Sequence, residues 1–85
     1  MAALLYKHYL IIATGQFAKA EGWLSVVDLS WGSGPDRGSH VIHDSSKLFQ
    51  SRQEAEIFAV EIGKAWVDER YKAHAGLGHL VIVNP

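Results

Sequence analysis

The chain has 85 residues, of which 48% are hydrophobic and 20% are charged, so its composition is that of a folded domain and not of a disordered segment. Its length predicts a single domain over residues 1–85 and leaves no room for the second lobe that would form an enzyme's cleft. Eight Lys and Arg residues oppose nine Asp and Glu residues, without the basic stripe that phosphate binding needs, and the absence of cysteine excludes disulfides and thiolate metal sites.

The hydrophobic runs are too short for a membrane protein. No stretch approaches the roughly 20 apolar residues of a membrane span, and no basic segment precedes the apolar run at residues 10–13. We therefore expect a cytoplasmic protein that does not bind a membrane. Because its charges are balanced and scattered, we also expect no general binding of nucleic acid.

The first half of the chain is rich in β-branched and aromatic residues, which favour strands. Two strands are predicted at about residues 5–14 and 22–31, followed by a loop rich in Gly and Ser and a short third strand at about 40–44. In the second strand, alternate side chains form a large apolar face that we expect to pack on the core: Trp23, Ser25, Val27, Leu29 and Trp31.

The second half of the chain predicts one long helix, at about residues 52–73. Ser51 and Glu54 form an S-x-x-E capping box, in which each side chain can satisfy the backbone amide of the other residue. Gly76 is a plausible residue for the end of the helix. A helical projection predicts one face against the sheet, formed by Ala55, Phe58, Ala59, Ile62, Ala65, Trp66 and Ala73. The expected fold class is therefore α+β, a three-stranded antiparallel meander with one long helix packed on one face.

A second, outer apolar stripe lies roughly opposite this face and is formed by Ile57, Val60, Val67 and Tyr71. It needs a partner, because a helix lying on one sheet buries only one face. The last residues, L-V-I-V, predict a C-terminal strand at about residues 79–83, which would promote aggregation if it were left unpaired. We therefore predict a homodimer that uses the tail strand, the second stripe, or both; the alternative is a monomer whose tail folds back. The predicted interface residues are Ile57, Val60, Val67, Tyr71, Leu80 and Ile82.

No pattern in the chain predicts catalysis, a metal site or a cofactor. His40 and His43 are three residues apart on a predicted strand, so their side chains should point to opposite faces and cannot share a metal. The loop that contains Gly32 and Gly34 matches no phosphate-binding motif. We therefore predict that the protein is not an enzyme and binds no cofactor.

The stretches F-Q-S-R-Q-E-A-E and A-W-V-D resemble those of small uncharacterised bacterial proteins that share a compact βββα unit. The matching residues are Phe49, Ser51, Glu54, Ala55, Ala65, Trp66, Val67 and Asp68. Since these are mostly capping and packing residues, the resemblance implies a fold and no activity. The leading expectation is a non-enzymatic protein-interaction or self-associating module.

The same layout is similar to that of HicB-type antitoxins, with Asp28, Leu29 and Gly32 at the matching end of the second strand. This resemblance implies, as an alternative, a module that binds a small toxin protein.

A further alternative is weak binding of single-stranded RNA, because small βββα sheets can present aromatic side chains to bases. Tyr6, Tyr9 and Trp31 are the residues that could serve this purpose.

Overall fold

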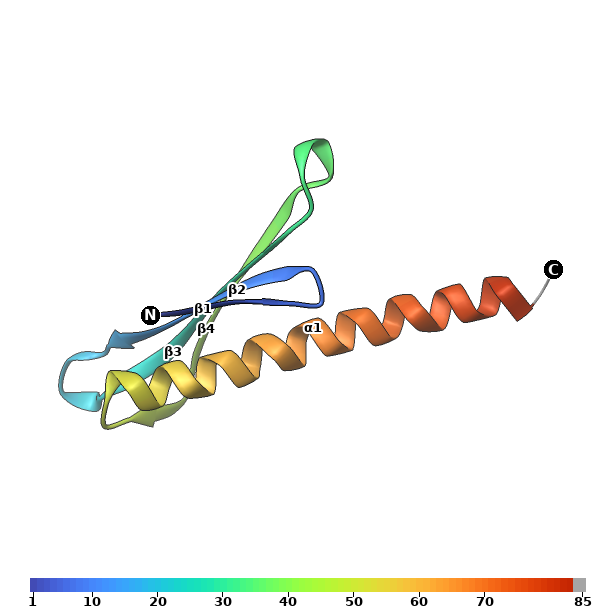
Figure 1. Cartoon of the computed structure of the whole chain (residues 1–85). Coiled ribbons are helices and arrows are strands. Elements are labelled where there is room, and N and C mark those ends of the chain that lie inside the picture. The colour runs from blue at the N-terminus through green and yellow to red at the C-terminus, as the bar shows by residue number, and fades with distance from the viewer. Residues whose placement is uncertain (84–85) are drawn as a thin grey trace.

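The structure is a computed structural model that describes the backbone of residues 1–83 and the side chains of residues 1–72. Four strands precede one long helix, and each strand pairs antiparallel with the next in sequence, so the sheet has the order β1-β2-β3-β4 (Figure 1). The predicted α+β meander with a helix on one face is confirmed in outline. In chain order the elements are β1 (Ala2–Tyr6), β2 (Tyr9–Phe17), the 3-10 turn η1 (Lys19–Glu21), β3 (Trp23–Trp31), the 3-10 turn η2 (Gly34–Asp36), β4 (Gly38–Phe49) and α1 (Arg52–Val83).

The first predicted strand, residues 5–14, is a hairpin, so the sheet has four strands instead of three. Tyr6 pairs with Tyr9, and only Lys7 and His8 lie between them. Both turn residues have positive φ, 50° and 70°, as a type I′ turn requires. Asn-Gly is the usual signal for this turn, and a Lys-His pair does not provide it. For that reason the sequence suggested one continuous strand.

The third predicted strand, residues 40–44, is the regular part of a longer edge strand. β4 follows β3 in regular register as far as Asp44 and rejoins the ladder at Phe49. Between these points the strand bulges, and Asp44 accepts hydrogen bonds from the backbone N–H and the hydroxyl of Ser46. The polar residues after Asp44 therefore form a bulge within one strand instead of ending it.

The predicted start of the helix is confirmed. The hydroxyl of Ser51 accepts a hydrogen bond from the backbone N–H of Glu54 at 3.2 Å and lies 3.1 Å from the Glu54 carboxylate. The carboxylate meets the hydroxyl of Ser51, whereas the sequence suggested that it would reach the amide. The first turn of α1 is thus closed by the residue pair that predicted it.

The predicted end of the helix, at about residue 73, is wrong. α1 continues to Val83, so the segment predicted as a C-terminal strand, 79–83, is helical, and the C-terminal end of α1 extends beyond the sheet (Figure 1). Leu80 and Ile82 of the predicted interface belong to this helical segment, and their side chains lie outside the described residues. Within the described part of the chain, no helix has both the length and the apolar character needed to cross a membrane.

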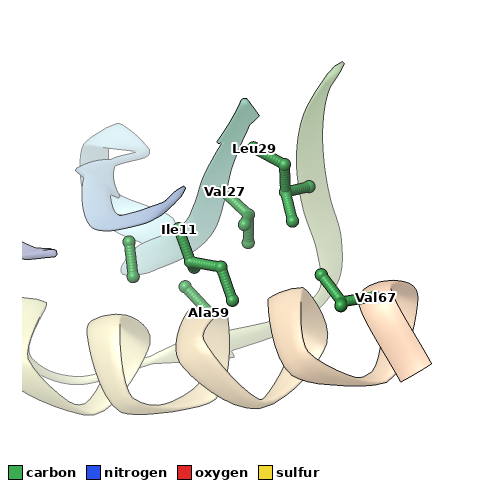
Figure 2. Packing of buried hydrophobic residues seen from close by; sticks show 6 residues of the cluster. Ile11, Val27, Leu29, Ala59 and Val67 are labelled. Atoms are coloured by element: carbon green, nitrogen blue, oxygen red, sulfur yellow. The ribbon is translucent and has the colours of Figure 1, made fainter. Parts of the chain in front are cut away.

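The core forms where the sheet meets a line of small residues on α1. Its fully buried members come from the two central strands and from the helix (Figure 2): Ile11, Ala13, Val27, Leu29, Ala59 and Val67. The buried positions of α1 recur every four residues, at Ala55, Ala59, Gly63 and Val67. A methyl group at Gly63 would lie 2.9 Å from Cγ2 of Ile11 and 3.1 Å from Cγ1 of Val27. Small side chains thus let the helix axis approach the sheet closely.

The face of α1 that contacts the sheet differs from the face that the sequence suggested. Ala65 is exposed, although it was expected to face the sheet, and Val67 is fully buried, although it was expected on the outer stripe. The bulky residues Phe58, Ile62 and Trp66 are half-buried and flank the line of small residues. The face of α1 that contacts the sheet is therefore rotated relative to the prediction. The helix approaches the sheet most closely along the small side chains, and the large side chains pack on either side of that line.

Candidate functional site

A groove of about 600 Å³ opens where the β1–β2 turn, the end of β3 and the middle of α1 come together. Among its described lining residues the side chains are aromatic or basic, and none is a carboxylate. The groove therefore combines apolar ring surface with positive charge, which suits a ligand that has both an apolar part and a negative charge. The described lining residues are Lys7, His8, Tyr9, Trp31, Gly32, Arg70 and Tyr71.

The β1–β2 turn places two of these residues at the groove in a strained backbone conformation. Lys7 and His8 both have positive φ, a region that costs a non-glycine residue roughly 1 kcal/mol or more. The turn has only these two residues, and both of them line the groove. Strained residues of this kind persist where the surrounding contacts hold them, and they are frequent at functional sites.

Contacts with α1 hold this turn in place. The Asp68 carboxylate accepts a hydrogen bond from the Lys7 ammonium at 2.7 Å and another from the Tyr6 hydroxyl at 2.9 Å. The hydrogen bonds from Lys7 and then Tyr6 lower the pKa of Asp68. The bond to the same carboxylate raises the pKa of the Lys7 ammonium and that of the Tyr6 hydroxyl. Asp68 therefore forms an ion pair with Lys7 and fastens the hairpin to the helix.

Arg70 is the groove's other strong cation, and aromatic rings support it. Its guanidinium carbon lies 4.6 Å from the centre of the Trp31 ring and 5.3 Å from that of Trp66. The ion pairs found among the described residues, Met1 with Glu56 and Lys7 with Asp68, do not include Arg70. A guanidinium that stacks on indole faces keeps its N–H groups directed along its own plane, where they can donate to an anion.

An aromatic cluster joins the groove to the edge strand. Tyr9 and Trp31 have ring centres 5.4 Å apart, and both lie within 6 Å of Trp66 (5.9 and 5.6 Å). His40 of β4 stacks on Trp66 of this cluster, with ring centres 5.2 Å apart and an angle of 15° between the rings. Trp31 also lies against the backbone of Gly38, where a methyl group would be 2.6 Å from the indole.

The histidines of β4 lie on opposite faces of the sheet, as the sequence predicted. His40 pairs with Leu29, whose side chain is buried under α1, whereas His43 pairs with Val26 on the open face. Among the described residues, no group of three His, Cys, Asp or Glu side chains is placed to hold a metal ion.

The residues predicted as an interface are divided between the core and the surface. Val67 is fully buried and Val60 packs against the core, so these two stabilise the fold of one chain. Ile57 and Tyr71 remain exposed, at 59% and 49% of their full surface. Tyr71 lines the groove, while Ile57 belongs to the outward face of α1.

Two further surfaces are open in the described chain. On the sheet face away from α1, the apolar side chains of Leu5, Leu10 and Val41 are exposed. At the sheet's long edge, β4 runs for twelve residues with β3 on one side and no strand on the other. This edge leaves outward backbone N–H and C=O groups free for pairing.

Arg70, Lys7 and His8 were not identified as site residues from the sequence. They come from segments more than sixty positions apart, as the Lys7–Asp68 contact illustrates with a separation of 61. The one local signal was the pattern Y-K-H-Y, in which two tyrosines are spaced as the paired ends of a two-residue hairpin.

Comparisons of the chain with family models, with curated proteins and with solved structures found no match.

Proposed function

We propose that this chain is a non-enzymatic interaction module that associates with a second copy of itself along the free edge of β4. The proposal is carried by the regular segment of that edge, residues 38–44. Natural edge strands are usually protected by Lys, Pro or a bulge. In β4 the bulge and Lys47 come only after Asp44, and the regular segment contains neither Lys nor Pro.

The opposite edge of the sheet is a poorer candidate. β1 has only five residues, and both of its ends are fastened to α1. The N-terminal ammonium of Met1 lies 2.8 Å from the Glu56 carboxylate, and Tyr6 donates to Asp68. A partner strand would have to fit between these contacts, so the long edge of β4 is favoured.

A second copy is the occupant that the edge fits best. Two identical antiparallel strands can pair about a twofold axis, because each then presents the same groups to the other. In the register centred on Ile42, His40 of one copy lies opposite Asp44 of the other, and the symmetry repeats this pair. Leu29 and Ser25, the β3 partners of these two residues, are both buried under α1, so His40 and Asp44 share the helix-facing side of the sheet.

The energy of this arrangement can be bounded. A directly opposed cross-strand pair contributes about 0.2–1 kcal/mol, and the twofold symmetry supplies two such pairs, in each of which the Asp44 carboxylate can accept a hydrogen bond from the His40 imidazole. Asp44→Lys removes both acceptors. We therefore expect this variant to weaken association by about two- to thirtyfold.

The test is a charge-swap cycle followed by sedimentation equilibrium. We expect the wild type to form dimers. Asp44→Lys and His40→Asp should each associate more weakly, and the double variant should recover association. Glu21→Lys, an equal charge change on the exposed turn η1, is the matched control and should leave association unchanged.

Circular dichroism of each variant separates loss of association from loss of folding, since His40 also stacks on Trp66. Recovery in the double variant cannot be explained by a general change in net charge. A wild type that sediments as a monomer at about 100 μM, a concentration at which a weak specific interface is occupied, contradicts the proposal. A charge-swapped double variant no better than its parents contradicts the proposed register.

A further inference from the structure

We propose that the groove between the β1–β2 turn and α1 binds a small organic anion with a planar aromatic ring. This inference is separate from self-association, because it concerns different residues at a different surface. It rests on the volume and lining of the groove, on the position of Arg70 and on the strained turn.

The size of the groove limits which ligands can occupy it. About 600 Å³ falls within the range of pockets that enclose small ligands. The side chains of Tyr9, Trp31 and Tyr71 supply aromatic surface along its length. A planar apolar body is the shape that makes the most contact with such walls, through offset or edge-to-face packing.

The basic residues of the groove determine where the ligand's anionic group binds. Arg70 and Lys7 are both basic, but Lys7 is already 2.7 Å from the Asp68 carboxylate. Arg70 makes no ion pair with a described residue, and its guanidinium carbon lies over the rings of Trp31 and Trp66, at 4.6 and 5.3 Å from their centres. A ligand's anionic group therefore meets Arg70 first, and a carboxylate or a phosphate can accept two parallel hydrogen bonds from it.

The strained turn supports the same site. A hairpin with glycine at these two positions would avoid the strain, yet the chain has Lys7 and His8 there, each with a side chain at the groove. His8 adds a ring that can donate a hydrogen bond to an anion. The turn thus maintains functional groups at the groove in a conformation that the backbone alone disfavours.

The ligands in the test separate ring from charge. Three probes share one ring: 2-naphthoate carries a carboxylate, 2-naphthyl phosphate a phosphate, and 2-naphthalenemethanol no charge. Acetate supplies a carboxylate without the ring. Each is titrated to about 10 mM, since ligands of this size often bind only in the millimolar range, and binding is followed by the amide NMR signals of His8 and Gly32.

We expect at least one naphthyl anion to bind about tenfold or more tightly than naphthalenemethanol and acetate, since a hydrogen bond to a charged group is worth a factor of this size. Whichever of 2-naphthoate and 2-naphthyl phosphate binds more tightly identifies the anionic group that the groove prefers. Arg70→Gln should remove this preference for the anion, and Arg70→Lys should restore part of it. Arg37→Gln, an equal loss of charge at the exposed end of η2, should leave affinity unchanged.

Arg70 is exposed, so its substitution should not prevent folding, and circular dichroism checks this. The proposal is overturned if naphthalenemethanol binds as tightly as both anions. It is also overturned if Arg70→Gln and Arg37→Gln bind the anions equally, or if no probe shifts the signals of His8 and Gly32.

Discussion

Val67 and Ile57 provide a direct test of the orientation of α1. The side chain of Val67 is fully buried in the core, whereas Ile57 keeps 59% of its surface exposed. Val67→Ala removes two buried methyl groups, which costs about 1.6 kcal/mol in transfer free energy, and the cavity adds about 1 kcal/mol. We therefore expect the free energy of unfolding to fall by about 2.5 kcal/mol. Ile57→Ala should change it by well under 1 kcal/mol, because a mostly exposed side chain loses little on truncation.

Thermal unfolding followed by circular dichroism measures the contrast. In a domain of this size each kcal/mol shifts Tm by about 4–8 °C, so Val67→Ala should melt at least 10 °C below the wild type. The melts are repeated at two protein concentrations, because destabilisation of an interface between copies would depend on concentration. Equal effects of the two variants would refute the orientation of the helix described above. A loss for Val67→Ala that disappears at high concentration would place this side chain at an interface.

Three further outcomes follow from close contacts and charged groups. Gly63→Val should destabilise the fold by about 1–3 kcal/mol through collision with Ile11, as urea unfolding would show, and an unchanged midpoint would contradict the close approach of α1. His8→Gly should raise Tm by a few degrees because it relieves about 1 kcal/mol of strain at positive φ, and a lower Tm would contradict the conformation of the turn. The hydrogen bonds from Lys7 and Tyr6 keep the folded-state pKa of Asp68 below its ordinary value, so their stabilisation is present above about pH 4 and is lost as the pH falls through the folded pKa. Urea unfolding at neutral and acidic pH should therefore show a smaller acid loss of stability for Asp68→Asn than for the wild type, and equal acid losses would contradict this role.

Local signals in the sequence were sufficient where a short segment determines its own structure. The capping box at Ser51 and Glu54 correctly predicted the first residue of α1, because both partners lie within one turn. Alternation in β3 correctly predicted its core face, on which Ser25, Val27 and Leu29 are fully buried. The hydroxyl of Ser25 is satisfied there by donating to the Ala55 carbonyl at 2.7 Å.

Other elements depend on contacts that a linear pattern does not contain. The segment around Lys7 has apolar residues on both faces, so the pattern of apolar residues does not change at the turn. No glycine or asparagine is present there as a turn signal. A short apolar run such as L-V-I-V is compatible with a strand or with a helix, and a glycine inside a helix costs only about 1 kcal/mol. The passage of α1 through Gly76 and Gly78 was therefore not excluded by either residue.

The groove could not be predicted because its members are brought together only by the complete fold. Trp31 reaches the groove from the end of β3, Arg70 from the middle of α1, and Lys7 from the hairpin. In the sequence, Arg70 was one of several charges on the polar flanks between the two apolar faces of the helix, and Trp31 was the last residue of a strand. Only the diagonal course of α1 across the sheet makes them neighbours (Figure 1).

The two proposed surfaces consist of different residues, but one residue of each contacts the ring of Trp66. His40, on the edge of β4, stacks on Trp66 at 5.2 Å, and Arg70, in the groove, lies 5.3 Å from the same ring. An anion that reorients Arg70 would change the contacts of Trp66, and so would a second copy that draws His40 toward its Asp44. If each event alters the position of this indole, the affinity of the groove for its ligand and the affinity of the two copies for each other must change by the same factor. Under that condition, Trp66 is the residue that would couple ligand binding with association.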